Sequence, residues 1–301
     1  MTDAHTTTTR LRTARFIAAA TLTSVLALTG CASTGTAPAK TAAAEPAPAS
    51  APGDASKDVT DATIREAAIS SDKTQDFVAA AAYWGQLYDR KPDDVDTGVN
   101  YSKALRQIGS VAQALTVMQR TQTLKPNDAD VLAEYGKALA AGGHPDQAEI
   151  TLARAAGMKP DDWTVLSALG VALDQLGHYA EAQDRYTAAL KLSPGNPSVL
   201  TNLGLSFALQ GKLDDAERTL REAVANPRAG ASARQNLAMV LGLKGNFDEA
   251  AKLARADLPQ TVADNNIAYL KEMLTQPAPW KQLETLDGQS GSSGQNEQLT
   301  P

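Results

Sequence analysis

A period of 34 residues runs through the middle of the chain and constrains its fold more than any other feature. The glycines that follow this period are Gly109, Gly143, Gly177, Gly211 and Gly245. The alanines are Ala80, Ala114, Ala148, Ala182, Ala216 and Ala250, and the prolines are Pro92, Pro126, Pro160 and Pro194. Three series with one period indicate a chain built from copies of a single supersecondary unit.

The unit from Trp163 to Asn196 has the pattern of two helices joined by a short turn. Its first half carries residues spaced along one side of a helix, namely Leu166, Leu169, Gly170 and Leu173. Gly177 is expected to end that helix, because glycine adopts the left-handed conformation found at helix C-termini. Pro194 is expected to stop the second helix, since proline breaks a helix interior.

This pattern resembles the tetratricopeptide (TPR) repeat, which implies an all-α superhelical solenoid. Units begin at Val95, Ala129, Trp163, Pro197 and Ala231, and residues 60–90 supply one more helix pair. We therefore expect five to six repeats over residues 60–274. Asn265–Leu274 is expected to be a capping helix. Residues 275–301 are rich in Pro, Gly, Ser and Gln, and we predict a disordered tail.

The first thirty residues have the three-part layout of a secretory signal. Arg10, Arg12 and Arg15 precede the apolar block Phe16–Leu28. A bilayer-spanning helix needs about 20 apolar residues, so this block is too short to cross. A buried helix of a globular domain is the competing interpretation, but no folded-domain pattern surrounds the block. Residues 1–30 are therefore predicted to be a signal peptide of an exported protein.

The residues Leu28-Thr29-Gly30-Cys31 resemble the lipobox of bacterial lipoproteins. The resemblance implies cleavage between Gly30 and Cys31 and acylation, for example with palmitate, at Cys31. The only cysteine of the chain cannot form an intramolecular disulfide, whereas two or more acyl chains would anchor it stably. An inert buried thiol is the competing interpretation. Ala32 follows in place of aspartate, which by resemblance to lipoprotein sorting implies the outer membrane, with the protein facing the periplasm.

Residues 31–59 are dominated by Pro, Ala, Ser, Thr and Gly. This composition predicts a flexible tether that spans roughly 30 Å. Without residues 1–30 the chain keeps 25 basic and 33 acidic residues, a net charge of −8. An acidic chain argues against a nucleic-acid partner, because phosphate binding needs clustered Lys and Arg. No second apolar run could span a membrane, so the lipid is the predicted anchor.

The sequence offers no catalytic constellation. His144 and His178 stand one repeat apart and raise the question of a metal site, but Lys212 and Asn246 take the equivalent places in the next units. We interpret both histidines as polar turn residues. Asp214-Asp215 opens a second helix, where carboxylates complement the helix dipole. No phosphate loop, GxSxG or HExxH motif occurs. We predict no metal, no cofactor and no enzymatic activity.

Trp280 lies in "PAPWKQL", beyond the last expected helix. An aromatic residue in a proline-flanked tail could dock on the solenoid or enter a partner. We favour docking on the solenoid.

The concave surface is the usual binding face of such solenoids. When each unit is numbered from its first residue, places 2, 5, 9 and 12 are concave candidates. Chaperone-type TPR domains hold a terminal carboxylate with lysines at places 2 and 5, and these places carry no lysine here. Apolar and amide side chains of the later units form the predicted groove: Val171, Asn202, Leu205, Ala208, Asn236 and Met239. It would suit an extended peptide or a helix. Packing between repeats is the competing interpretation.

The order of lipobox, tether and TPR array resembles the TadD lipoproteins of the tight-adherence (Flp) pilus. The likeness is concentrated in Arg234–Leu274. There an irregular last repeat is followed by "ADLP" and then by an expected helix with an Asn-Ile-Ala-Tyr-Leu core. The resemblance implies a non-enzymatic scaffold that helps the outer-membrane secretin and other pilus parts to assemble. A general cell-envelope scaffold for peptidoglycan or outer-membrane biogenesis enzymes is the alternative. An enzyme regulator, or an enzyme with an unrecognised site, is a further one.

Overall fold

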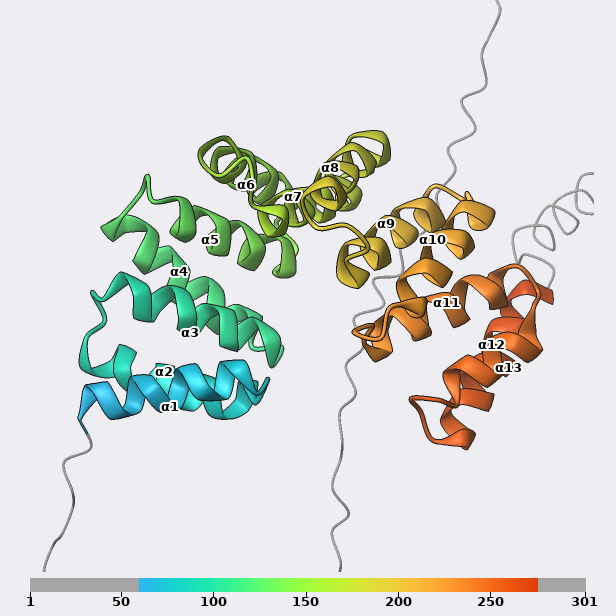
Figure 1. Ribbon diagram of the computed structural model, residues 1–301, viewed down its shortest axis with the longest axis horizontal. Helices are drawn as coiled ribbons and strands as arrows, with labels where there is room; N and C mark the ends of the chain where they lie inside the picture. The colour runs from blue at the N-terminus through green and yellow to red at the C-terminus, as the bar shows by residue number, and fades with distance from the viewer. Residues whose placement is uncertain (1–59, 276–301) are drawn as a thin grey trace, which may run out of the picture. The chain divides into compact units, whose positions relative to one another are not determined.

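The computed structural model describes residues 60–275, and in this range the chain forms thirteen α-helices and no strand (Figure 1). The helices are α1 (Asp61–Lys73), α2 (Phe77–Arg90), α3 (Val95–Gln107), α4 (Val111–Leu124), α5 (Ala129–Ala141), α6 (Pro145–Met158), α7 (Trp163–Gln175), α8 (Tyr179–Leu192), α9 (Pro197–Leu209), α10 (Leu213–Ala225), α11 (Ala231–Leu243), α12 (Phe247–Ala254) and α13 (Gln260–Thr275). Six helix pairs precede one last helix. This confirms the expected all-α solenoid of helix–turn–helix repeats. The predicted signal peptide, Cys31, the tether and the tail from residue 276 lie outside the described residues.

Each inter-helix turn is built around a glycine of the 34-residue series. Gly109, Gly143, Gly177, Gly211 and Gly245 have φ angles of 79°, 77°, 79°, 80° and 86°. Residues with a side chain rarely adopt this left-handed conformation. At the end of α7 the His178 N–H donates to the Leu173 carbonyl at 2.9 Å, which satisfies one of the last carbonyls of the helix. The 34-residue spacing of these glycines therefore marks where the first helix of each repeat ends.

The first helix of each central repeat begins at a side chain that caps it. The capping residues are Asp94, Asp128, Asp162 and Asn196, again one period apart. Each side chain accepts a hydrogen bond from a backbone N–H of the first turn, which would otherwise have no partner inside the helix. Sequence therefore fixes both where these helices begin and where they end.

The two helices of a repeat approach closely because a glycine of the first faces a large side chain of the second. Gly170 faces Tyr186, Gly136 faces Leu152 and Gly204 faces Leu220. A Cβ atom added at Gly170 would lie 2.6 Å from Cε1 of the Tyr186 ring. Tyr186 is almost completely buried, so the ring fills the space that the missing side chain leaves.

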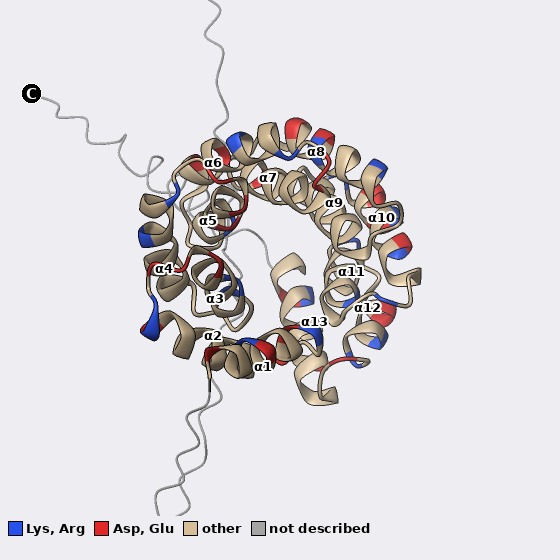
Figure 2. Cartoon of the chain, turned by 60° about the vertical axis from the view of Figure 1, so that its left-hand side comes forward, with Lys and Arg blue, Asp and Glu red and all other residues tan. Residues whose placement is uncertain are grey.

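The repeats stack so that the helices lie in two layers (Figure 2). The inner layer contains α3, α5, α7, α9 and α11, and the outer layer contains α4, α6, α8, α10 and α12. Each inner helix packs against the outer helix that follows it and against the next inner helix. Packing thus covers an inner helix on several sides, and its remaining exposed side faces the interior of the curved stack.

The C-terminal end departs from the period. α12 has only 8 residues, whereas the outer helices before it have 13 or 14. The next helix, α13, consequently begins at Gln260 and not at Asn265, as a strict 34-residue step from Ala231 would require. None of the described helices is both long enough and apolar enough to cross a membrane.

Candidate functional site

The exposed side of the inner helices α7, α9 and α11 is a stripe at places 2, 6, 9 and 13, counted from the first residue of the helix. These spacings of four, three and four residues keep the side chains on one side of a helix. These three helices, which are consecutive in the inner layer, carry only uncharged side chains on this stripe. They are Thr164, Ala168, Val171 and Gln175 on α7, Ser198, Asn202, Leu205 and Leu209 on α9, and Ser232, Asn236, Met239 and Leu243 on α11. We call these twelve residues the neutral inner face.

The six side chains predicted to form a groove all come from these three helices, and all are half-buried. Val171 lies on α7, three of them (Asn202, Leu205 and Ala208) on α9, and two (Asn236 and Met239) on α11. Val171 and Ala208 also pack against the hydrophobic clusters of their repeats. Packing between repeats therefore accounts for part of the burial of these two.

The accessible places differ in part from those expected. Place 5 is closed in the central repeats, since Ser167 and Thr201 are each 6% exposed. Place 13 is open instead, and Leu209 there is 53% exposed. Sequence reasoning missed Leu209, although the spacing from Asn202 and Leu205 would have placed it on the same side of the helix.

Charge is nearly absent from α7, α9 and α11. They contain one acid, Asp174, and one base, Arg234, and both are engaged. Asp174 accepts hydrogen bonds from the Ser206 hydroxyl at 2.6 Å and from the Tyr186 hydroxyl at 2.8 Å. Nε of Arg234 donates to Asp257 at 2.8 Å. In the same repeats, residues 163–254, most charged residues lie on the outer helices α8, α10 and α12 instead (Figure 2).

The Asp174 contacts join two repeats through a polar cluster beneath the neutral inner face. Burial raises the pKa of the Asp174 carboxyl to about 6, although its hydrogen bonds from Ser206 and Tyr186 favour the ionised form. Burial also raises the pKa of the Tyr186 phenol. Closer to the surface, the Asn202 amide donates to the Ser167 hydroxyl at 3.2 Å. The α7–α9 junction is thus held in one arrangement by hydrogen bonds as well as by apolar packing.

The earlier inner helices have a different surface, in which charges pair across repeats. Arg106 on α3 donates two hydrogen bonds to Glu134 on α5, at 2.7 and 3.0 Å, and the Ser102 hydroxyl donates a third at 3.1 Å. Lys137 donates to the Thr164 hydroxyl on α7 at 3.1 Å. Burial lowers the pKa of Lys137. The inner layer therefore changes from charged to neutral between α5 and α7.

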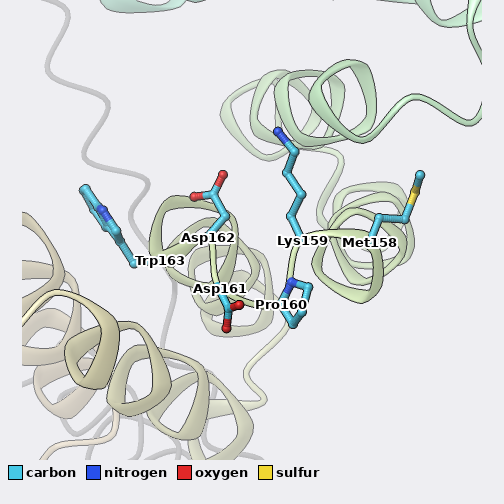
Figure 3. Close-up of a pocket in the computed structure, with 6 residues that line it drawn as sticks. All are labelled: Met158, Lys159, Pro160, Asp161, Asp162 and Trp163. Carbon is cyan, nitrogen blue, oxygen red and sulfur yellow. The ribbon is translucent and has the colours of Figure 1, made fainter.

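One hollow on the described surface, of about 460 Å³, follows the turn from α6 to α7 and is lined by Met158, Lys159, Pro160, Asp161, Asp162 and Trp163 (Figure 3). The side chains of Met158, Lys159 and Trp163 diverge, so they do not enclose a ligand (Figure 3). Lys159 pairs with Asp130, and Asp162 caps α7. This hollow is a consequence of the turn.

A second hollow, of about 250 Å³, lies between the starts of α3 and α5. Its lining is Val95, Asp96, Val99, Asn100, Asp128 and Asp130. Asp128 is already used as a helix cap and Asp130 pairs with Lys159. The hollow therefore belongs to the charged part of the inner layer, and two of its three aspartates already have partners within the protein.

His144 and His178 are exposed, and each directly precedes an outer helix, α6 or α8. Their positions match the interpretation as turn residues. Within residues 60–275, no group of three or more His, Cys, Asp or Glu side chains is arranged to hold a metal ion.

The tetratricopeptide repeat family model matches three overlapping stretches, residues 135–197, 167–232 and 201–261. Each stretch covers about two of the helix pairs described above. Residues 135–261 are tetratricopeptide repeats. Proteins built from such repeats are protein-interaction scaffolds, and stacked repeats create the extended concave surface on which they bind.

One solved structure of low sequence identity has a similar fold. A chain of the APC/C hetero-tetramer Cut9–Hcn1 aligns with a TM-score of 0.55 and 18% identity over 75% of this chain and 45% of its own length. Structures of MamA align with lower TM-scores. One of them has a TM-score of 0.44 and 26% identity over 56% of this chain and 96% of its own length. A search of curated proteins found no significant match.

Proposed function

We propose that this TPR protein is a non-enzymatic, membrane-anchored scaffold whose neutral inner face holds an extended segment of a partner protein. The observation that carries the proposal is the uncharged stripe shared by α7, α9 and α11. None of the twelve residues on this surface is an acid or a base that could activate their hydroxyls for catalysis. The surface does have hydroxyl, amide and apolar groups. These groups continue over three successive repeats, so an extended peptide could contact them along its length.

The chemistry of the face defines the partner segment. Burying a charged side chain against it would remove water without supplying an opposite charge, which is unfavourable. The amides of Asn202 and Asn236 can donate to and accept from the backbone of an extended peptide. Leu205, Leu209 and Met239 supply apolar contact beside them. We therefore expect a partner segment of apolar and small uncharged residues.

The anchor in this proposal is the lipid at Cys31, with residues 31–59 as a tether that lets the solenoid work away from the membrane surface. Support comes from the lipobox resemblance and from the short apolar block before it. The proposed location is the outer membrane, with the solenoid facing the periplasm.

The proposed process is assembly of the tight-adherence (Flp) pilus, with its outer-membrane secretin and other pilus components as candidate partners. The supporting observation is the resemblance of Arg234–Leu274 to TadD lipoproteins. These residues span most of α11, all of α12 and nearly all of α13, and they contain the early start of α13 that breaks the repeat period. A general envelope scaffold is the second candidate, because TPR solenoids serve many assemblies.

Chemical crosslinking in intact cells, followed by purification of the protein from outer membranes, tests this function. We expect a secretin in the eluate of the wild-type protein. The Cys31→Ser variant is the matched control, since it leaves the described helices unchanged: it should lose acyl labelling, leave the membrane fraction and recover no secretin. Peptidoglycan hydrolases without any secretin would contradict the pilus function. A Cys31→Ser protein that stays in the membrane would contradict the lipid anchor.

A further inference from the structure

The last helix, α13, has apolar side chains on two different sides. One side, with Ala263, Ile267 and Leu270, belongs to the contact with α11 and α12, where Leu270 lies against Gly242. Away from it, Tyr269 is 65% exposed and Met273 is 53% exposed. These two residues are four apart and therefore neighbours on the helix surface. We call Tyr269 and Met273 the α13 patch.

The order of the repeats indicates what should cover this patch. Every odd-numbered helix from α1 to α11 packs against the even-numbered helix that follows it in the chain. α13 follows the same alternation and packs against α11 and α12 behind it. A helix that completes its pair would come from the residues that follow α13 in the chain, and residues 276–301 begin where α13 ends.

The sequence of that segment fits the missing position. "PAPWKQLETL" (residues 277–286) places Trp280, Leu283 and Leu286 at intervals of three residues, as on one side of a short helix. Four residues separate Thr275 from Trp280. Only three separate the end of α11 from Phe247, the first residue of α12. Such short connections join antiparallel neighbouring helices.

We propose that residues 277–286 turn back along α13, so that Trp280 and Leu283 cover the α13 patch and close the C-terminal end of the solenoid. The rise of a helix is about 1.5 Å per residue. The path from Trp280 to Leu286 therefore matches in length the path from Met273 back to Ile267. Trp280 meets Met273, and Leu283 meets Tyr269. The segment belongs to the fold of the scaffold and is not a free tail.

Fluorine NMR of the full chain labelled with 5-fluorotryptophan tests the proposal. The three resonances belong to Trp84, Trp163 and Trp280 and are assigned with single Trp→Phe variants. We expect a small H2O-to-D2O shift for Trp280, as for a buried indole. The Tyr269→Ser/Met273→Ser variant should move the Trp280 resonance toward the free-indole position and increase its solvent shift at least twofold.

The matched control is Val78→Ser/Ile150→Ser, which removes two apolar side chains that are 70% and 65% exposed on α2 and α6. It should leave the Trp280 resonance in place. A Trp280 H2O-to-D2O shift as large as that of a free indole in the wild-type protein would overturn the proposal. So would a Trp280 resonance that does not move in the Tyr269→Ser/Met273→Ser variant. A Trp280 resonance that becomes protected only as protein concentration rises would also overturn it, because a second copy would then be the cover.

Discussion

Gly170→Val is expected to lower the free energy of unfolding by about 3 kcal/mol, because overpacking and the loss of a buried hydrogen bond act together. The new Cβ would lie 2.6 Å from Cε1 and 2.8 Å from Cζ of Tyr186. The ring cannot withdraw freely, since its hydroxyl donates to Asp174 at 2.8 Å. Urea denaturation followed by circular dichroism measures the change.

Gly157→Val is the matched control for this prediction. Gly157 also lies inside a helix, α6, but a Cβ there would meet nothing within 4 Å. Its effect should stay within about 0.5 kcal/mol, with a slight gain in helix propensity over glycine. Equal losses for the two variants would mean that the Gly170–Tyr186 contact does not hold the repeat together.

Glu134→Ala is expected to cost about 3 kcal/mol, because it removes one partner of a buried ion pair and leaves the other without compensation. The Glu134 side chain is 6% exposed and that of Arg106 is 19% exposed. The variant takes away both acceptor atoms of the Arg106 guanidinium and the acceptor of the Ser102 hydroxyl. The same denaturation measurement applies.

An exposed pair serves as the comparison for Glu134. Arg221 and Glu249 also join two repeats, but their side chains are 45% and 43% exposed. Glu249→Ala should therefore cost less than about 1 kcal/mol. In the double variant Arg106→Met/Glu134→Leu, apolar side chains replace both charges, and most of the lost stability should return. A double variant as unstable as Glu134→Ala would show that the charge left behind is not the cause.

Much of the fold could be predicted because each repeat carries its own signals for helix starts and ends. The helices α3, α5, α7, α9 and α11 begin at the residues where the units were expected to begin. The start of α13 could not be obtained in this way. It depends on the early end of α12, and the irregular sequence there has no counterpart in the other units.

The candidate site was predictable in its helices but not in every place along them. Five of the six expected residues lie on the open stripe at places 6 and 9. Ala208 is partly covered, and Leu209 is more exposed. Which side of an inner helix remains open depends on how tightly the neighbouring repeats pack, which a single unit does not reveal. The Arg106–Glu134 pair was hidden for the same reason, since its partners are 28 residues apart and meet only in the stacked repeats.

The most direct test of the account is to find what touches the neutral inner face in the cell. A photoreactive phenylalanine analogue is placed at Leu205, and in a control protein at Val78, which is 70% exposed on α2. Irradiation should give one protein adduct from Leu205 that Val78 does not give. Mass spectrometry should locate the crosslink in an uncharged segment of an envelope protein. No adduct from Leu205, or the same adducts from both positions, would contradict the claim that this face binds a partner.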